Sequence, residues 1–376
     1  MRNYIDTFII KTAAICNLNC TYCYYFNGAD TSYLGRPKVM SKDLIKKTVD
    51  RIIEHTHDHN LKYIDVSLHG GEPLLMGKDL FCFMMEEINR IEESKVVVRR
   101  KIQTNAVLLD HEWLDLLAKY HVNVGISIDG PEAVNDKNRV DLGGRGTYKR
   151  AVKGLKAALN YKLRGLNIGV LSVINPNYSG RVMYNHLRDL GVEKIDFLLP
   201  EGNYVHLPFD YKPFSNQTPF ADFIIEVFDA WLEEDNPDVF VRLPDRLIRS
   251  ALNGDSQSDV FGNSPIRVAV VETDGSIEPT DNFKMCEDRM TNMGLSIFDN
   301  DFNDLCKHNF FESVLLKEDM VPSECAGCKY VDKCGGGRIT TRYSKEHQFN
   351  KKTIYCHDLY KTMNHAESIV KQFTNA

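Results

Sequence analysis

Three cysteines stand close together near the start of the chain, and their number restricts the chemistry that they can support. The segment "AAICNLNCTYCYYF" (13–26) places Cys16, Cys20 and Cys23 with three and two residues between them. A structural zinc ion and an electron-carrying iron–sulfur cluster each take four protein ligands. Three thiolates on a [4Fe–4S] cluster leave one iron open to chelate the amine and carboxylate of a small molecule. The spacing therefore indicates a catalytic cluster, with a three-cysteine zinc loop as the alternative.

A second polar stretch, "HGGEP" (69–73), ends the second predicted strand. Gly70 and Gly71 have no side chain, so the backbone can approach a neighbour closely there. Glu72 offers a carboxylate to an ammonium group. An ordinary turn is the alternative interpretation of this stretch.

A third stretch, "SIDG" (127–130), ends the fourth predicted strand. Ser127 and Asp129 offer a hydroxyl and a carboxylate to a ribose or a carboxylate there. Gln103 and Asn105 in "QTNA" could line the same cleft, or simply cap a strand. Three such stretches at successive strand ends favour one shared ligand site over three unrelated turns.

Four further cysteines form a closed set near the end of the chain: Cys325, Cys328, Cys334 and Cys356. Four thiols suit a structural zinc ion or a second iron–sulfur cluster. The run of glycines at 335–337 allows backbone N–H groups to point at sulfur, which suits a cluster somewhat better.

Composition excludes several classes of protein. The 376 residues are 43% hydrophobic and 26% charged, with a net charge of −6 and no Lys/Arg-rich run, which argues against a nucleic-acid partner. Asp6 and Lys11 interrupt the first apolar stretch, so it is no signal peptide. No run approaches the roughly 18 apolar residues of a membrane span. We therefore predict a cytoplasmic protein without a membrane partner, whose ten cysteines serve metal rather than disulfides.

Short apolar strands alternate with amphipathic helices from residue 7 to about residue 200, which predicts a parallel sheet with right-handed crossovers. Strands are expected in "TFIIKTAAI", "YIDVSLHG", "RRKIQTNAV", "VNVGISIDG", "LNIGVLSVIN" and "KIDFLLPEG", and helices after Ser41 and at 78–92, 110–119, 147–161 and 178–190. Six such units fit an α/β fold of the partial (β/α)6 barrel type. Ligands in such folds gather at the carboxyl ends of the strands.

The strand–helix alternation lapses after Gly202. A hairpin with an Asp274–Gly275 turn is expected in "IRVAVVETDGSIEP". We predict two domains, a barrel at 1–235 and a cysteine-rich domain at 236–376.

The chain resembles radical S-adenosylmethionine enzymes. Cys16, Cys20 and Cys23 match the cluster motif of that family, with the aromatic Tyr22 before the last cysteine, and "GGEP" matches the segment that holds the methionine amine. The resemblance implies that the open iron binds S-adenosylmethionine. Reductive cleavage would then give a 5′-deoxyadenosyl radical that takes a hydrogen atom from the substrate.

The same resemblance assigns further contacts to the cofactor. Ser127 and Arg139 are the choices for the methionine carboxylate, although Arg145 and Arg150 are near, and the backbone near Leu199 would meet the adenine. A low-potential electron donor of the flavodoxin or ferredoxin type is implied as a partner.

The C-terminal segment resembles the SPASM extension, which usually carries seven cysteines and two auxiliary clusters. This chain departs from that pattern, because Thr280 and Arg338 stand where the family often has cysteine. We therefore predict one auxiliary cluster and two [4Fe–4S] clusters in all. Cys286 and Cys306 are expected to be lone buried thiols rather than ligands of a further cluster.

Two tail segments, "VVETDGSIEPTDNFKMC" and "CGGGRITTRYSKEHQFNKKTIYCHDLY", resemble the subgroup that crosslinks ribosomally made peptides into cyclophanes. This resemblance implies a precursor peptide as substrate and a carbon–carbon crosslink between an aromatic side chain and a nearby β-carbon. The auxiliary cluster would accept the surplus electron. Asp281 is the candidate base for the proton, with a solvated turn aspartate as the alternative interpretation.

Two other functions stay open at this point. An anaerobic sulfatase-maturating enzyme, which oxidises Cys or Ser to formylglycine, shares the barrel and an aspartate at this hairpin, but normally keeps both auxiliary clusters. A non-enzymatic iron–sulfur carrier or zinc-stabilised binding protein would leave the open three-thiol site beside "GGEP" without a purpose.

Overall fold

The computed structural model describes residues 4–256, 258, 260–262, 264–315 and 320–374. The chain forms two interleaved compact units. Unit 1 comprises Met1–Ser127, Asp136–Ile168 and Ile266–Leu316, and unit 2 comprises Ile128–Asn135, Gly169–Pro265 and Lys317–Ala376. The division into domains 1–235 and 236–376 stays a prediction.

Unit 1 contains a sheet with the strand order β4-β3-β2-β1-β8-β9. Its strands are β1 (Thr7–Ala13), β2 (Tyr63–Gly70), β3 (Val97–Thr104), β4 (Asn123–Ser127), β8 (Val268–Val271) and β9 (Ile277–Glu278). All neighbours pair in parallel except β8 and β9, which form the expected hairpin. β1 therefore lies in the interior of the sheet, between β2 and β8, and its side chains meet two neighbouring strands.

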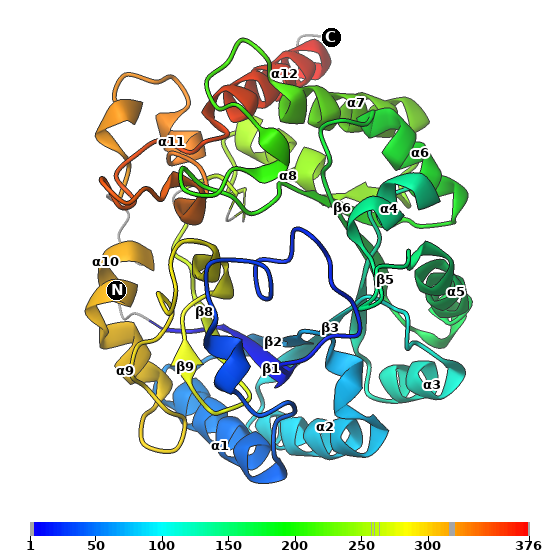
Figure 1. The fold of residues 1–376 in the computed structure, drawn as a ribbon, viewed down its shortest axis with the longest axis vertical. Helices are drawn as coiled ribbons and strands as arrows, with labels where there is room; N and C mark the ends of the chain where they lie inside the picture. Colours follow the sequence, from blue (N-terminus) through cyan, green and yellow to red (C-terminus); the bar gives the residue numbers. More distant parts are fainter. Residues whose placement is uncertain (1–3, 257, 259, 263, 316–319, 375–376) are drawn as a thin grey trace. The chain divides into compact units, whose positions relative to one another are not determined.

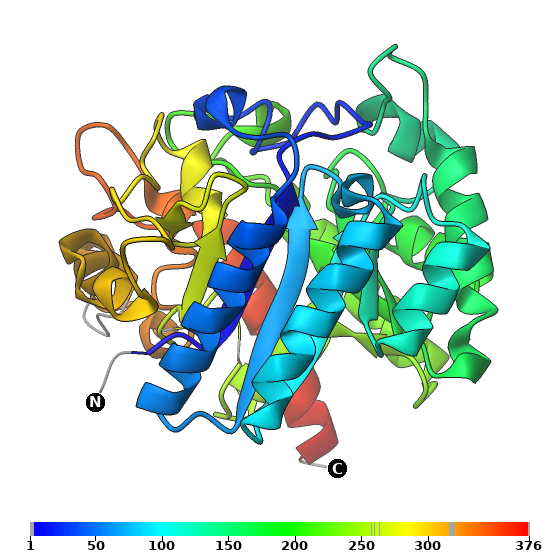
Figure 2. The same cartoon turned by 90° about the horizontal axis from the view of Figure 1, so that it is seen from below.

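Helices follow the strands of unit 1 as the alternating pattern predicts. They are α1 (Lys42–Asp58), α2 (Lys78–Glu93), α3 (His111–Lys119), α5 (Tyr148–Leu159), α9 (Phe302–Lys307) and α10 (Asn309–Leu315). The short helix α4 (Glu132–Asn138), before α5, is divided between the two units. Short 3₁₀ turns stand at η1 (Ser32–Gly35), η2 (Pro73–Met76), η3 (Lys162–Arg164) and η5 (Asp281–Met285). The Ser41 hydroxyl accepts a hydrogen bond from the Leu44 N–H and so caps α1 as expected. Figure 2 shows α1 and α2 along the same side of β1 and β2.

Unit 2 contains the parallel strands β5 (Ile168–Val173), β6 (Lys194–Leu198) and β7 (Phe240–Val241). Its helices are α6 (Gly180–Asp189), α7 (Pro219–Glu234), α8 (Arg242–Ala251), α11 (Val331–Cys334) and α12 (Cys356–Thr374), and its 3₁₀ turns are η4 (Pro208–Asp210), η6 (Ser323–Cys325) and η7 (Ile339–Arg342). α12 packs against α7 and α8, as Figure 1 shows.

A buried carboxylate joins α12 to the start of α7. Asp358 is fully buried and accepts hydrogen bonds of 2.9 Å from the backbone N–H groups of Phe220 and Ala221, and another from the Tyr211 hydroxyl. The N–H groups at the start of a helix have no partner within it, so this side chain supplies one. Because Cys356 lies two residues earlier, Asp358 also fixes the first turn of α12, which carries that thiol.

The fold class expected from sequence, an α/β parallel sheet with crossover helices, is confirmed. The four helices expected after residue 77 end within two residues of the observed bounds. Within the described ranges, none of the helices is both long and apolar enough to cross a bilayer.

Replacing Asp358 by Ala should lower the free energy of unfolding by about 2–5 kcal/mol, because three buried donors lose their acceptor. The urea midpoint measures this loss. The matched control, Asp222→Ala, removes an exposed carboxylate that pairs with Lys361 and should change the free energy by no more than about 0.5 kcal/mol. Equal midpoints for both variants would show that Asp358 does not anchor α12.

Candidate active site

The loop that carries Cys16, Cys20 and Cys23 follows β1 directly and belongs to unit 1. The Cys23 N–H donates to the Cys20 carbonyl at 3.0 Å, and the Leu18 N–H donates to the Cys16 sulfur at 3.4 Å. Burial raises the pKa of Cys16 to about 12 and also raises that of Cys23. Metal ligands must be thiolates, so these thiols need a strong positive charge beside them, such as that of iron. The donor set therefore fits an iron–sulfur cluster.

Gly70 and Gly71 allow residues 70–72 to lie directly against the start of the cysteine loop. A Cβ at Gly70, whose φ is +150°, would lie 2.3 Å from the Ala13 carbonyl oxygen, and one at Gly71 would lie 2.2 Å from that of Ile15. Two backbone bonds close this contact, from Gly71 N–H to Ala13 at 2.8 Å and from Glu72 N–H to Ile15 at 2.9 Å. The glycines are thus required for close approach, as the sequence indicated.

Glu72 is buried beside this contact, and burial raises the pKa of its carboxyl group. Its oxygens accept from the Thr104 hydroxyl at 2.7 Å and from the N–H groups of Asn105 at 2.8 Å and Leu74 at 3.1 Å. Each carboxylate oxygen has two lone pairs, so one cation can still be bound. The predicted contact with an ammonium group stays a prediction.

Asn105 links this carboxylate to the cysteine loop. Its side-chain amide donates to the Asn17 side chain at 2.8 Å and lies 3.9 Å from the Cys16 sulfur. Gln103 lies on β3, two residues before Asn105, and its side-chain amide donates to the Ser127 hydroxyl on β4 at 2.7 Å. The structure thus brings Glu72 and Asn105 to the cysteine loop, and joins Gln103 to Ser127.

Arg139 is buried and donates to the Tyr22 hydroxyl at 2.8 Å, within the cysteine loop. Arg145 and Arg150, the neighbours considered from sequence, instead pair with Asp141. Arg139 thus contacts the cysteine loop directly, and its role toward a cofactor carboxylate stays a prediction.

Asp129 and Leu199 belong to unit 2. The Asp129 carboxylate accepts from the Val173 N–H at 3.0 Å, at the end of β5. Leu199 is buried directly after β6. Their predicted contacts with a cofactor stay predictions.

Asp281 lies in the interior of unit 1 and is 3% exposed, so the solvated-turn interpretation is wrong. It forms an ion pair with the fully buried Lys11 and accepts from the Tyr24 hydroxyl at 3.1 Å. Burial alone would raise the pKa of Asp281, but the Lys11 ammonium outweighs it, and the pKa falls to about 2.

Lys11 also donates to His69 Nδ1 at 3.1 Å and lies 4.8 Å from the centre of the Tyr25 ring. Burial and the Lys11 charge lower the pKa of His69 to about 4, so this imidazole is neutral at pH 7. Sequence analysis did not assign Lys11 a role. The available signal was a single cation inside the otherwise apolar strand "TFIIKTAAI", since buried cations need a partner.

A second group of buried charges ties the β8–β9 hairpin to the segment after the cysteines. Glu272 accepts from the Tyr25 hydroxyl at 2.8 Å and pairs with Arg36 at 2.9 Å. Lys284 pairs with Glu278 at 2.7 Å and lies 3.4 Å from Glu272. These contacts fix the hairpin that precedes Asp281 against the cysteine loop.

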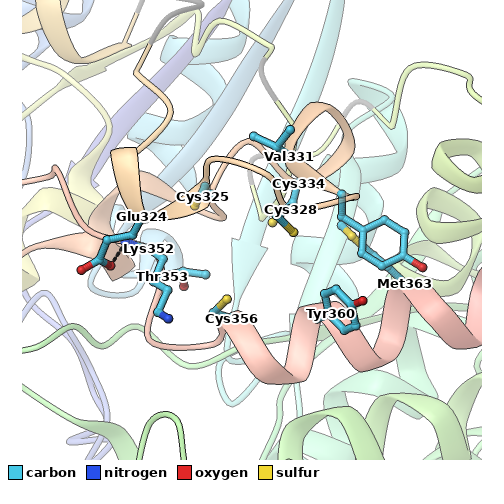
Figure 3. A pocket seen from close by; sticks show the side chains of 12 residues that line it. Glu324, Cys325, Cys328, Val331, Cys334, Lys352, Thr353, Cys356, Tyr360 and Met363 are labelled. Carbon is cyan, nitrogen blue, oxygen red and sulfur yellow. Dashed lines mark hydrogen bonds between the residues drawn. The ribbon is translucent and has the colours of Figure 1, made fainter.

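The four C-terminal cysteines converge in unit 2. Figure 3 shows Cys325, Cys328, Cys334 and Cys356 around a cavity, with Cys356 at the start of α12. The volume of this cavity is about 100 Å³. A single zinc ion would need its ligands about 2.3 Å from one atom, whereas a cluster needs a cavity between them. No three Cys, His, Asp or Glu side chains in the described part of the chain lie close enough to hold one metal ion. The cavity between the four thiols fits a cluster.

A buried arginine holds the glycine run beside these thiols. Arg342 donates to the carbonyls of Gly335 and Gly337, and to that of Met320 at 2.6 Å. Burial lowers the pKa of Arg342 to about 10, while it raises that of Cys334 to about 12. Arg338, at the position where the SPASM pattern has cysteine, forms an ion pair with Glu201.

Comparison with known proteins places this geometry in a family. The family model described as "Radical SAM superfamily" matches residues 10–210. A cysteine-type anaerobic sulfatase-maturating enzyme of Clostridium perfringens is 26% identical over 353 residues, which cover 93% of this chain and 92% of that protein. A serine-type enzyme of Bacteroides thetaiotaomicron is 24% identical and covers 88% of this chain and 82% of that protein.

Solved structures agree on the fold. The structure "Native anSMEcpe with bound AdoMet" superposes with a TM-score of 0.84 at 24% identity, and covers 98% of this chain and 99% of that one. The same protein with a Kp18Cys peptide gives 0.83, at 24% identity and with the same coverage. The expectation of a cyclophane-forming maturase is therefore wrong, because relatives of known type that match nearly the whole chain are anaerobic sulfatase-maturating enzymes.

Replacing Lys11 by Met should give the melting temperature a pH dependence that the wild-type protein does not have. In the wild type the pKa of Asp281 is about 2, below its ordinary value, so the ion pair stabilises the fold above about pH 4. Without Lys11, burial raises this pKa, and the ionised carboxylate destabilises the fold by about 3–5 kcal/mol. The loss in melting temperature should be larger at pH 8 than at pH 5, where the carboxyl takes up a proton.

The double variant Lys11→Met, Asp281→Asn is the control, because it removes both charges and retains His69. Its melting temperature should not show this additional pH dependence. An equal loss at pH 5 and pH 8 in the single variant would contradict the assigned coupling.

Proposed function

Because this chain belongs to the Radical SAM superfamily, we propose that it oxidises a cysteine or serine side chain of a peptide to formylglycine. The observation that carries the proposal is the similarity to anaerobic sulfatase-maturating enzymes along 93% of the chain. The buried Asp281 beside the cysteine loop supports it, since the oxidation releases a proton as well as an electron.

As a radical S-adenosylmethionine enzyme, the chain uses S-adenosylmethionine and a [4Fe–4S] cluster, which together supply a radical that removes one hydrogen atom. Cys16, Cys20 and Cys23 would hold the cluster. Glu72 would bind the methionine ammonium, and Ser127 and Arg139 its carboxylate. The buried walls around Glu72 would exclude water from this cofactor.

Asp281 would take the proton from the substrate S–H or O–H. A carboxylate with a pKa near 2 is a weak base toward an ordinary thiol or alcohol. Loss of a hydrogen atom from the neighbouring carbon makes that S–H or O–H more acidic, and loss of the electron to the acceptor then drives the proton onto Asp281. Lys11 would keep Asp281 ionised and ready to accept, and Tyr24 would orient it.

The electron balance requires an acceptor. A cysteine CH₂–SH group loses one hydrogen atom, one proton and one electron to become a thioaldehyde, which water converts to the aldehyde and H₂S. A serine side chain gives the aldehyde directly. The four-cysteine site of unit 2 would hold the second [4Fe–4S] cluster, which takes this electron. A low-potential flavodoxin or ferredoxin would be the donor to the first cluster.

The product tests the proposal. Peptides that differ only in Cys, Ser or Ala at one position are incubated anaerobically with S-adenosylmethionine and dithionite. We expect the Cys peptide to exchange sulfur and two hydrogens for one oxygen, or the Ser peptide to lose two hydrogens, with no change in the Ala peptide. Tandem fragmentation should show a linear chain that reacts with hydrazines. A macrocyclic product without an aldehyde would contradict the proposed formation of formylglycine.

Asp281→Asn should slow peptide oxidation by about 10²–10⁴-fold, while the release of 5′-deoxyadenosine continues, because the base acts after the hydrogen atom has been removed. Both products are followed by mass spectrometry. Asp245→Asn, which alters a carboxylate on the helix α8, is the control and should leave both rates unchanged. Loss of 5′-deoxyadenosine in the Asp281 variant would instead place the residue in cofactor binding.

Reconstituted protein should hold about eight irons, from two clusters of four each. The triple variant of Cys16, Cys20 and Cys23 to Ala and the pair Cys325→Ala, Cys328→Ala should each retain about four irons. The first should release no 5′-deoxyadenosine, and the second should release it without oxidising peptide. About twelve irons in the wild type would show that a further site exists.

A further inference from the structure

Arg342 is the one buried cation among the described residues of unit 2, and 5% of its surface is exposed. Its guanidinium donates to the carbonyl oxygens of Gly337 at 3.0 Å and Met320 at 2.6 Å, and also to that of Gly335. These acceptors are neutral, and no carboxylate in the described part of the chain pairs with this arginine. A buried charge without an opposite charge nearby is costly in a protein interior. Arg342 therefore needs an anion that its hydrogen-bond partners do not supply.

The guanidinium of Arg342 lies against the glycine run that forms part of the wall of the four-cysteine cavity. Gly336 lines this cavity, and a Cβ at Gly336, whose φ is +82°, would lie 3.2 Å from the Arg342 Cζ. A side chain at this position would therefore press on the guanidinium. The glycine thus allows the positive charge to pack directly behind the cavity wall.

The Arg342 charge acts on two of the four thiols. Burial raises the pKa of Cys325 and raises that of Cys334 to about 12, while the Arg342 charge opposes this rise at both. Burial lowers the pKa of Arg342 to about 10, and the two thiolates oppose that change in turn. The side chain is therefore protonated at pH 7. The thiolates of the four-cysteine site are the anions that compensate this buried cation.

Two other charged side chains, Glu324 and Lys352, line the cavity (Figure 3). Glu324 is exposed and Lys352 is half-buried, and the Glu324 carboxylate accepts from the Lys352 backbone N–H at 3.2 Å. Their charges are opposite, so their effects on the cavity offset each other, and water screens charges that reach the surface. The buried Arg342 therefore provides the charge that is least screened.

We propose that Arg342 raises the reduction potential of the cluster that these four cysteines hold, and so makes that cluster an electron acceptor. A [4Fe–4S] core with two positive charges and four thiolates has two net negative charges, and one added electron gives three. A fixed cation stabilises the more negative state more strongly, and net charge is one of the factors that set the potential of such clusters. The substrate radical loses the electron that the cluster gains, and no proton moves at the cluster.

The source of that electron rests on the proposed peptide oxidation, whereas the effect of Arg342 on the potential does not. The alternative role for Arg342 is purely structural, since its donors hold the glycine carbonyls in place. Two substitutions separate charge from structure. Glutamine keeps an amide donor without the charge, and lysine keeps the charge without the planar guanidinium.

The test uses the full chain with Cys16, Cys20 and Cys23 changed to Ala, so that the unit 2 cluster is measured alone. Anaerobic redox titration followed by electron paramagnetic resonance gives its midpoint potential, with neither peptide nor S-adenosylmethionine present. In this background Arg342→Gln should lower the equilibrium constant for one-electron reduction at least about tenfold, which is about 59 mV. Arg342→Lys should keep this constant within about threefold, because the charge remains.

The control is Lys361→Gln in the same background. Lys361 is an exposed cation of α12, the helix that begins at Cys356, and it pairs with the exposed Asp222. Its removal should change the equilibrium constant by no more than about twofold, since solvent screens this charge.

Three results would overturn the proposal. The first is an unchanged potential in Arg342→Gln, and the second is an equal shift in the glutamine variant and in either the lysine variant or the control. The third is loss of the four irons from both Arg342 variants, which would make the residue purely structural. Irons lost from the glutamine variant and kept in the lysine variant would support the proposal, because the charge then decides whether the cluster is held.

The potential and the peptide product are separate measurements, so the two proposals fail separately. A lower potential in Arg342→Gln without any formylglycine in the wild type would overturn the peptide reaction alone. Formylglycine in the wild type with an unchanged potential in Arg342→Gln would overturn the role of Arg342 alone.

Discussion

The buried ammonium of Lys11 is the interaction on which the candidate active site of unit 1 depends. An unpaired charge in a protein interior costs several kcal/mol, so the groups around it are constrained to compensate it. Asp281 supplies the opposite charge, His69 accepts a hydrogen bond, and the Tyr25 ring lies across the cation. These three residues come from the end of the β8–β9 hairpin, the end of β2 and the segment after the cysteine loop. A single side chain on β1 therefore brings together the hairpin, the end of β2 and the segment after the cysteine loop.

The second constraint is steric, and it acts at the same strand end. Gly70 and Gly71 bring β2 so close to residues 13–15 that a methyl group would overlap a carbonyl oxygen. This contact places Glu72 beside the cysteine loop, where the N–H of Asn105 and the hydroxyl of Thr104 hold its carboxylate. The same Asn105 then reaches Asn17 and Cys16. This part of the candidate site is thus built from main-chain contacts first, and its polar side chains are positioned by them.

These two constraints explain what the sequence could predict. Strands, helices and the Asp274–Gly275 hairpin follow from local periodicity, and the cysteine spacings follow from ligand chemistry. The partners of Lys11 are 58 and 270 residues away in sequence, so no local pattern could pair them. Asp281 was selected from its place after the hairpin, yet its burial and low pKa depend on this distant cation. Arg342 likewise stands within the quoted C-terminal segment and was given no role from sequence, although it holds the glycine run beside Cys334.

The wrong prediction of a cyclophane arose because the two reactions place the same demands on the site. Crosslinking and formylglycine formation both begin with loss of a hydrogen atom and then need one proton acceptor and one electron acceptor. In the proposed mechanism, Asp281 and the four-cysteine site would meet these needs for either reaction, so the site residues alone do not separate them. The reactions differ in what the carbon radical meets next, an aromatic ring or its own deprotonated sulfur or oxygen atom. The similarity to anaerobic sulfatase-maturating enzymes along 93% of the chain, and not the geometry of the site, is therefore what favours oxidation of a single side chain.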